Sequence, residues 1–152
     1  MYHLELKIPP PIVILVCGIV IALFSLGGVL PFAFPGMIGV AVFLAFLGFV
    51  ICLVAFLGFQ RAKTTWKPEH PEKATTLVTN GIYRFSRNPM YLGWLFVLLG
   101  WAIFWGDGLA FIILPFYVFY LNRFQIVPEE RALQEKFGDE YTAYKSKVRR
   151  WL

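Results

Sequence analysis

The sequence contains little charge for its length. Aspartate, glutamate, lysine and arginine make up 15% of its 152 residues, whereas 59% of the residues are hydrophobic and 18% are aromatic. Soluble domains are typically about 25% charged and ~45–50% apolar. The scarcity of charge therefore argues against a soluble domain, and the length argues for one domain over residues 1–152.

Cysteine and histidine are nearly absent. Cys17 and Cys52 both lie in apolar runs and show no spacing typical of a disulfide framework or a redox pair. We interpret them as small apolar packing residues. His3 and His70 are each alone in their segments, so the sequence suggests no metal site.

Charge is missing altogether from four apolar runs. They cover residues 12–30, 37–59, 90–105 and 109–121. The first two are long enough to cross a hydrocarbon core of ~30 Å at ~1.5 Å per residue. The last two are short and are separated only by Gly106-Asp107-Gly108, which predicts a helical hairpin. We expect an all-α integral membrane protein with four transmembrane helices, over about 12–30, 37–59, 90–105 and 109–124, and a cytoplasmic amphipathic helical tail.

The first apolar run has an alternative interpretation as a cleaved signal sequence. A signal sequence needs a basic start, a shorter apolar core and a cleavage site of small residues. Only Lys7 precedes this run, which continues to Pro31 without an Ala-x-Ala pattern. We therefore favour a membrane span. The first two runs also lack ionisable residues, which argues against an ion or proton transporter.

The basic residues are confined to alternate connections. Of the 14 lysines and arginines, one precedes the first run, six lie between the second and third, and seven follow the fourth. The positive-inside rule then places both termini, the 60–89 loop and the active site in the cytoplasm. We expect the cell inner membrane as the location. This topology accounts for the net charge of +5 without a nucleic-acid partner.

The tail has the apolar spacing of an amphipathic helix. Gly138-Asp139 divides it, because glycine can end one helix and aspartate can cap the next. Pro128 is predicted in the first turn of the tail helix, where Glu129 and Glu130 would complement the helix dipole or bind a ligand. The residues that recur at intervals of three or four are Leu133, Phe137, Tyr141, Tyr144 and Val148.

A polar stretch, TNGIYRFSRNPMYLGW over residues 79–94, lies directly against an apolar run. A turn, a basic anchor for lipid headgroups and a helix start at Pro89 would explain part of it. Those roles leave Tyr83, Tyr91 and Gly93 unexplained. A helix start presents free N–H groups, and Gly93 permits another group to approach closely. With the acidic pair of the tail, these features suit a small zwitterionic cofactor that carries a sugar and an aromatic base.

Two motifs resemble those of the isoprenylcysteine carboxyl methyltransferase family and its phospholipid methyltransferase relatives. The first is TLVTNGIYRFSRNPMYLGW, in which Asn88 replaces the family's usual histidine. The second is PEERALQEKFGDEYTAYKSKVRRW, whose final arginine match is Arg150. The resemblance covers about residues 60–152. It implies an integral membrane methyltransferase that uses S-adenosylmethionine and acts on a small lipophilic or lipid acceptor in the membrane lipid.

The resemblance also implies where the cofactor binds. Its site would be built from residues 75–93 and 122–150, with the adenine against the apolar hairpin and the reactive methyl group facing the membrane. No catalytic residue is assigned, because methyl transfer by in-line displacement depends mostly on positioning and desolvation. The candidate cofactor-binding residues are Thr75, Thr76, Leu77, Val78, Tyr83, Asn88, Pro89, Met90, Tyr91, Glu129 and Glu130.

One departure from the family pattern concerns the acceptor. In the prenylcysteine enzymes an arginine four residues before the first tail glutamate is thought to hold the substrate carboxylate, and here that position is Gln125. Arg123 is two residues away, on a different face of a helix. Both are candidate substrate-binding residues. Without the arginine, a neutral or cationic acceptor such as an amine, thiol or hydroxyl is favoured over a carboxylate.

Two other function classes remain open at this point. Sterol reductases, which bind a nicotinamide dinucleotide, have a similar tail, although they are much longer chains. A membrane scaffold without catalytic activity would bind no cofactor tightly.

Overall fold

The computed structural model describes residues 5–62 and 75–152, and all regular elements within these ranges are helical. The longer helices are α1 (Pro10–Leu26), α2 (Met37–Arg61), α3 (Pro89–Trp105), α4 (Ile113–Leu121) and α5 (Val127–Lys147). Three short helical turns connect them: η3 (Gly81–Arg84), η4 (Gly108–Ile112) and the π-helical η5 (Asn122–Ile126). The expectation of an all-helical protein is confirmed for the described residues.

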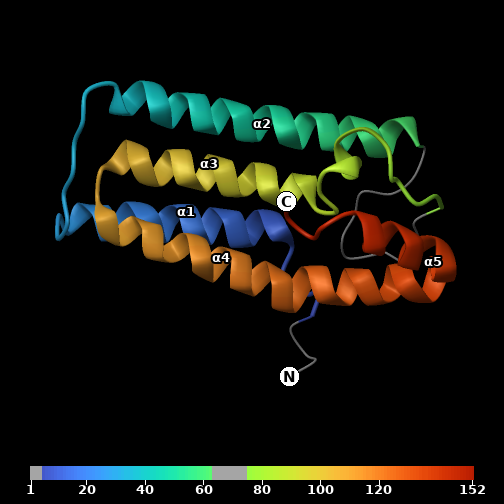
Figure 1. The fold of residues 1–152 in the computed structure, drawn as a ribbon. Helices are drawn as coiled ribbons and strands as arrows, with labels where there is room; N and C mark the ends of the chain where they lie inside the picture. Colours follow the sequence, from blue (N-terminus) through green and yellow to red (C-terminus); the bar gives the residue numbers. More distant parts are fainter. Residues whose placement is uncertain (1–4, 63–74) are drawn as a thin grey trace.

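Helix α3 is the centre of the bundle and packs against α2, α1 and α4 (Figure 1). Its contact with α2 is close because glycines face each other across it. A Cβ atom at Gly93 would lie 2.6 Å from the Gly48 carbonyl oxygen, and one at Gly100 would lie 2.6 Å from the Ala41 carbonyl oxygen. The glycines therefore let the two backbones approach at van der Waals distance, which is the usual way for membrane helices to pack tightly.

At one end of the bundle the α1–α2 connection pairs with the α3–α4 connection. The carboxylate of Asp107 is 1% exposed and accepts hydrogen bonds from the backbone N–H groups of Leu30 and Leu109, at 3.2 and 2.8 Å. The Gly108 N–H donates to the Leu30 carbonyl at 2.8 Å. The prediction that the first helix continues to residue 30 is wrong in this detail: α1 ends at Leu26, because residues 30–32 make these pairings instead.

At the other end, α4 continues into α5 through the π-helical turn η5. Pro128 lies in the first turn of α5, as the sequence predicts, but this turn is not a free helix start, because the residue before Val127, Ile126, already has helical φ and ψ of −66° and −45°. Proline inside a helix removes a hydrogen bond and crowds the carbonyl four residues earlier. The wider turn directly before Pro128 accommodates both effects. Consequently Glu129 and Glu130 are not at a free helix start and do not complement an exposed dipole there.

The predicted division of the tail at Gly138 is confirmed. Gly138 has φ of 49° and ψ of −119°, so the chain turns back within α5 (Figure 1). The Gly138 carbonyl accepts hydrogen bonds from Gln134 and Thr142, at 2.9 and 3.1 Å. The turn brings the two halves of the apolar pattern together, and all five predicted residues, with Leu77, form one cluster: Tyr141, Tyr144 and Val148 at its centre, and Leu77, Leu133 and Phe137 around them.

Much of the apolar surface faces outward. Leu15 of α1, Phe46 of α2 and Phe119 of α4 are each more than 60% exposed, as expected where lipid rather than water surrounds the helices. By length and composition, α2 and the continuous helix of residues 108–147 are sufficient to cross a membrane, whereas α1 and α3 are shorter apolar helices of 17 residues. The fold is thus consistent with a membrane protein, and the four-span topology stays a prediction.

Candidate functional site

The polar motifs meet at the end of the bundle opposite Asp107. The start of α3, the end of α2 and the whole of α5 lie at this end (Figure 1). The segment before α3 passes over the end of α2 as the turn η3, where the Tyr83 ring packs edge-on against Phe59 with centroids 5.2 Å apart. The Tyr83 hydroxyl donates to the Ala55 carbonyl at 3.3 Å, and the Tyr144 hydroxyl donates to the Tyr83 carbonyl at 2.7 Å. Tyr83 therefore joins α2 to the tail.

The central contact of the site joins α3 to α5. The Tyr91 hydroxyl donates a hydrogen bond to Glu129 Oε1 at 2.5 Å. Among residues 5–62 and 75–152, Tyr91 is the one hydrogen-bond partner of this carboxylate. Burial raises the pKa of Glu129 to about 8; the nearby Glu130 charge adds to that effect, and the hydrogen bond from Tyr91 opposes it. The site therefore holds a partly accessible carboxyl group that is desolvated and lightly partnered, as a ligand-binding group often is.

Glu130, the next residue, is held between two arginines. Arg87 Nη2 donates to its Oε1 and Arg150 Nη2 to its Oε2, both at 2.7 Å, and Arg150 Nε also reaches Oε1 at 3.1 Å. Burial alone would raise the pKa of Glu130, but the hydrogen bonds from Arg150 and Arg87 outweigh it and lower that pKa. Glu130 is 8% exposed. Unlike Glu129, it is already saturated with partners, so its contacts support a positioning role next to the candidate cofactor.

The C-terminal strap, which we define as residues 148–151, ties the two motifs together. The Arg87 N–H donates to the Arg149 carbonyl at 3.0 Å, and Arg87 Nη1 donates to the Val148 carbonyl at 2.9 Å. The Arg150 carbonyl accepts from Ser86 Oγ at 3.3 Å and from Asn88 Nδ2 at 3.0 Å. These bonds determine the path of the chain immediately before α3, within the first motif.

The strap is also anchored on its other side. The Trp151 indole N–H donates to Asn122 Oδ1 at 3.1 Å, in the π-helical turn. The strap thereby connects three parts of the chain that are far apart in the sequence. Its hydrogen bonds join the C-terminus to the segment before α3 on one side and to the turn after α4 on the other.

The remaining candidate cofactor-binding residues surround these contacts. Pro89 and Met90 begin α3, and the Met90 carbonyl accepts a hydrogen bond from Cys52 Sγ at 3.3 Å. Leu77 packs on the tail cluster, Val78 is partly buried, and Thr75 and Thr76 are exposed. The structure thus brings Asn88–Tyr91 together with Glu129 and Glu130.

The two candidate substrate-binding residues lie beside the N-terminal segment. Gln125 is fully buried; its Nε2 donates to the Ile8 carbonyl at 2.6 Å, while its Oε1 is buried without a partner among the described residues. Arg123 Nη1 donates to Glu5 Oε1 at 2.6 Å, and its guanidinium lies 5.3 Å from the Phe124 ring centroid. Both side chains are therefore engaged with residues 5–8 or with the ring next to them.

The structure corrects one expectation about the site, the role of Gly93, and bears on a second, metal binding, only for the described residues. The group that approaches Gly93 closely is helix α2, not a ligand, since the Cβ position of Gly93 would lie 2.6 Å from both the Gly48 carbonyl oxygen and Cys52 Sγ. Within the described residues no group of three or more histidine, cysteine or acidic side chains is arranged to hold a metal ion. His3 and His70 lie outside the described residues.

The sequence did not reveal the roles of Arg87, Arg150 and the strap carbonyls. Both arginines belong to the recognised motifs, and the acidic residue between them in space was a candidate. The sequence nevertheless contained a clue. A buried charge needs a partner of opposite sign, so Glu130 in a partly apolar helix requires cations, and the two motifs contain Arg87 and Arg150.

Comparison with known proteins agrees with this site. A family model described as "Phospholipid methyltransferase" matches residues 36–140. Protein-S-isoprenylcysteine O-methyltransferase of Mus musculus is 33% identical over 73 residues, which are 48% of this chain and 26% of that enzyme. A probable protein-S-isoprenylcysteine O-methyltransferase of Oryza sativa subsp. indica is 29% identical over 109 residues, 72% of this chain and 57% of that protein.

A shorter bacterial relative also matches. An uncharacterized protein of Haemophilus influenzae is 49% identical over 63 residues, 41% of this chain and its own entire length. The chain spans about a quarter of the mouse enzyme and just over half of the rice protein. The family match includes Tyr91, Glu129 and Glu130 but ends before the strap, and the chain spans only part of the mouse and rice relatives.

Proposed function

The chain belongs to the phospholipid methyltransferase family, and from that membership we propose that it is a membrane-embedded methyltransferase that uses S-adenosylmethionine and acts on a lipophilic acceptor. The observation that carries the proposal is the contact between Tyr91 and Glu129, which places a partly accessible, desolvated carboxyl group at the start of α3. A single small site of this kind, at one end of a bundle with an apolar exterior, suits a reaction between a polar cofactor and a membrane-borne acceptor.

The residues present fit such a cofactor. S-adenosylmethionine supplies a methyl group on a positively charged sulfur and also carries ribose hydroxyls, an amino group and an adenine. Glu129 accepts hydrogen bonds from hydroxyl or amino groups, and Asn88, whose amide nitrogen donates to the Arg150 carbonyl, keeps its amide oxygen as a further acceptor. In this proposal Tyr91 orients Glu129, and the Arg87–Glu130–Arg150 cluster holds both motifs at fixed separation.

The chain's contribution to the reaction would be positioning and exclusion of water. Aligning an acceptor atom with the methyl carbon turns an encounter between two molecules into a step within one complex, and a site at the apolar surface keeps water from competing. Glu129 is largely withdrawn from water, and this burial is what raises its pKa to about 8. No side chain here is required to form a covalent intermediate.

The chemical class of the methyl acceptor is inferred from two side chains at the same end of the molecule. Gln125 presents a neutral amide, and Arg123 is paired with Glu5. Neither provides a free cation for a carboxylate, so the proposal favours an amine, thiol or hydroxyl on a lipophilic molecule. O-methylation of a protein-S-isoprenylcysteine, the reaction for which the mouse and rice relatives are named, is the less favoured reaction for this chain.

The proposal includes a location in the cell inner membrane with four spans. The described basic residues between α2 and α3 and after α4 lie at the site end of the bundle, whereas the connections at the Asp107 end carry none (Figure 1). Both termini and the site would then be cytoplasmic. Reporter fusions after Arg61 and after Leu152 test this arrangement: both are expected on the cytoplasmic side, and opposite sides would remove the four-span topology.

A binding titration tests the cofactor. The purified protein in lipid nanodiscs is titrated by calorimetry with S-adenosylhomocysteine, the demethylated product, and in parallel with NADPH. We expect saturable binding of the former and none of the latter. Binding of NADPH alone would support the reductase class instead, and binding of neither would favour a membrane scaffold.

A further inference from the structure

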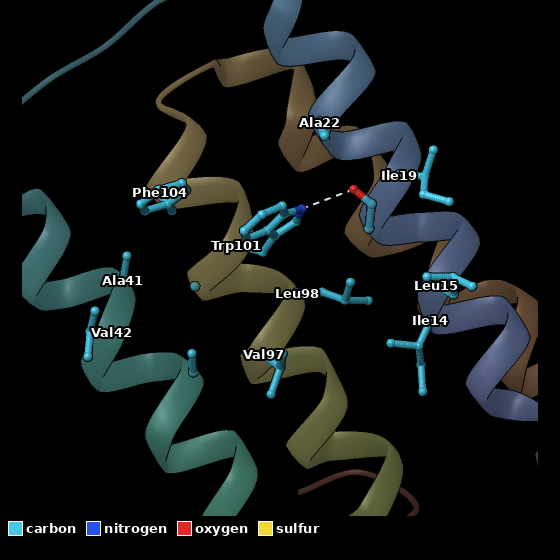
Figure 2. A pocket seen from close by; sticks show the side chains of 13 residues that line it. Ile14, Leu15, Ile19, Ala22, Ala41, Val42, Val97, Leu98, Trp101 and Phe104 are labelled. Atoms are coloured by element: carbon cyan, nitrogen blue, oxygen red, sulfur yellow. Dashed lines mark hydrogen bonds between the residues drawn. The ribbon is translucent and has the colours of Figure 1, made fainter.

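An apolar groove of about 510 Å³ lies between α1 and α2, and its floor is α3 (Figure 2). Gly18 and Ala22 line it on α1, Ala45 on α2, and Val97, Trp101 and Phe104 on α3. In Figure 2 Trp101 lies between α1, which carries Ala22, and α2, which carries Ala41. The volume is within the ~300–1,000 Å³ typical of pockets for small molecules.

The groove offers no free polar group to an occupant. All its lining side chains are apolar except the indole N–H of Trp101, which donates to the Gly18 carbonyl at 3.0 Å and is thereby satisfied (Figure 2). Small residues on the walls and large rings on the floor leave a channel rather than a flat surface. A hydrocarbon chain is the one ligand chemistry that such a lining accommodates without a desolvation cost.

The floor of the groove leads back to the candidate site. Along α3, the residues Met90, Trp94, Val97, Trp101 and Phe104 follow one another at intervals of four, three, four and three, so they form a single stripe. Met90 directly precedes Tyr91, which contacts Glu129, and the two side chains leave α3 ~100° apart, so the stripe begins beside the site and not within it. At ~1.5 Å per residue, the stripe extends ~10 Å from Met90 to Val97 and ~21 Å from Met90 to Phe104. The hydrocarbon core of a bilayer is ~30 Å thick, so Phe104 lies beyond its middle if Met90 lies at one surface.

We propose that this groove binds the hydrocarbon tail of the methyl acceptor, and that the tail is long enough to pass the middle of the bilayer. The inference rests on the proposed function, since the polar head of the acceptor would be held beside Tyr91 and Glu129 while its tail follows the stripe. A tail reaching only ~10 Å from Met90 would leave the groove empty, whereas one of ~20 Å fills it.

Selection of this tail over bulk lipid has a physical basis. Lipid chains are as apolar as the groove, so burial alone gives no preference. A tail whose head is bound at the site is tethered, and tethering raises its effective concentration at the groove.

Photochemical crosslinking tests the proposal. The protein in nanodiscs is illuminated with hexadecylamine or octylamine that carries a diazirine at the end of its tail, and the labelled residues are identified by mass spectrometry. Ala22 and Ala45 report on the groove, and their neighbours Leu23 and Phe46, which are 59% and 65% exposed and do not line it, report on ordinary lipid contact at nearly the same depth. For hexadecylamine we expect severalfold more labelling of the groove pair than of the neighbours, and for octylamine no such enrichment.

Two glycine variants make the test specific. Gly18→Phe places a ring in the groove, whereas Gly39→Phe places one on the open outer face of α2, where no atom lies within 4 Å of its Cβ position. The preferential labelling of the groove by hexadecylamine should disappear in Gly18→Phe and persist in Gly39→Phe. If Gly18→Phe does not fold, Ala22→Phe takes its place, with labelling measured at Ala45. Equal labelling of groove and neighbours in the wild type would overturn the proposal and show ordinary surrounding lipid.

Binding of S-adenosylhomocysteine in the same nanodiscs separates the two levels of the argument. Product binding without groove enrichment overturns the tail site and leaves the proposed function intact. Groove enrichment without product binding means that the proposed function has failed, and the assignment of the tail to a methyl acceptor fails with it.

Discussion

The hydroxyl of Tyr91 and the carboxylate of Glu129 are 2.5 Å apart, although 38 residues separate them in the sequence. Tyr91 is in the first turn of α3, and Glu129 follows the π-helical turn that joins α4 to α5. Their contact makes one site out of two motifs, because each supplies a group that the other orients. It also explains why the two motifs, far apart in the sequence, meet at one end of the helical bundle.

Glu129→Ala should weaken binding of S-adenosylmethionine by about tenfold to a hundredfold, because it removes a hydrogen bond from the charged amino group of the cofactor, and such a bond contributes ~1.5–3 kcal/mol. Calorimetry in nanodiscs measures the effect. Glu135→Ala, which removes an exposed carboxylate from the same helix, is the matched control and should bind like the wild type. Unchanged affinity in a folded Glu129→Ala protein would remove Glu129 from the cofactor site.

The raised pKa of Glu129 predicts a dependence of stability on pH. Burial moves this pKa from 4.5 to about 8, so between those values the folded protein holds a proton that the unfolded chain has released. The stability that Glu129 contributes to the folded protein is therefore complete below pH 4.5, and it is lost as the pH rises towards about 8. Glu129→Gln keeps a neutral side chain and should lack this slope in thermal unfolding. Parallel pH profiles for the two proteins would show that Glu129 does not titrate in this way.

Arg150→Met should destabilise the protein by ~1–3 kcal/mol, because it removes two of the three hydrogen bonds that Glu130 accepts while Arg87 still compensates part of the charge. Arg149→Met is the control, since that side chain is exposed. The variant should also weaken product binding, because Glu130 is adjacent to Glu129. Equal melting temperatures and equal affinities in the two variants would show that the strap is dispensable.

The sequence predicted the helices and the two motifs, and physical reasons explain what it did not predict. Charge-free runs and the turn at Gly138 depend on local composition, so they were visible. The end of α1 at Leu26 depends on pairing with Asp107, 77 residues beyond Leu30, which no local pattern encodes. Likewise, the helical context of Pro128 depends on the π-helical turn before it. The roles of the arginines required a three-dimensional arrangement in which Glu130 lies between them.

Gly93→Ala should destabilise the α2–α3 contact by ~1–3 kcal/mol, as expected for overpacking, because its new methyl group would meet the Gly48 carbonyl and Cys52 Sγ at 2.6 Å. Gly39→Ala makes the same chemical change where no atom lies within 4 Å, and should be neutral or slightly stabilising. Thermal unfolding in one detergent compares the two. A Gly93→Ala protein as stable as Gly39→Ala would mean that the helices separate at no cost.

The last prediction concerns the acceptor. Gln125 is fully buried, its amide nitrogen is bound to the Ile8 carbonyl, and its unpartnered Oε1 can only accept a hydrogen bond. An acceptor molecule with an N–H or O–H group suits that oxygen, whereas a carboxylate would be repelled by it. Arg123 could serve a carboxylate only by leaving Glu5, whose pKa is lowered chiefly by the hydrogen bond from Arg123.

We therefore expect little or no methylation of a prenylcysteine analogue by the wild-type protein, measured with labelled S-adenosylmethionine beside a panel of lipophilic amines and thiols. Gln125→Arg should disturb the junction with Ile8, because it buries a cation where an amide is now bonded, and should not create strong carboxyl methylation. Arg123→Ala should leave amine or thiol methylation largely intact, since Arg123 faces Glu5. Robust prenylcysteine methylation that survives Gln125→Arg and collapses in Arg123→Ala would reverse the assignment, because it would make Arg123 the carboxylate-binding group and the acceptor a carboxylate.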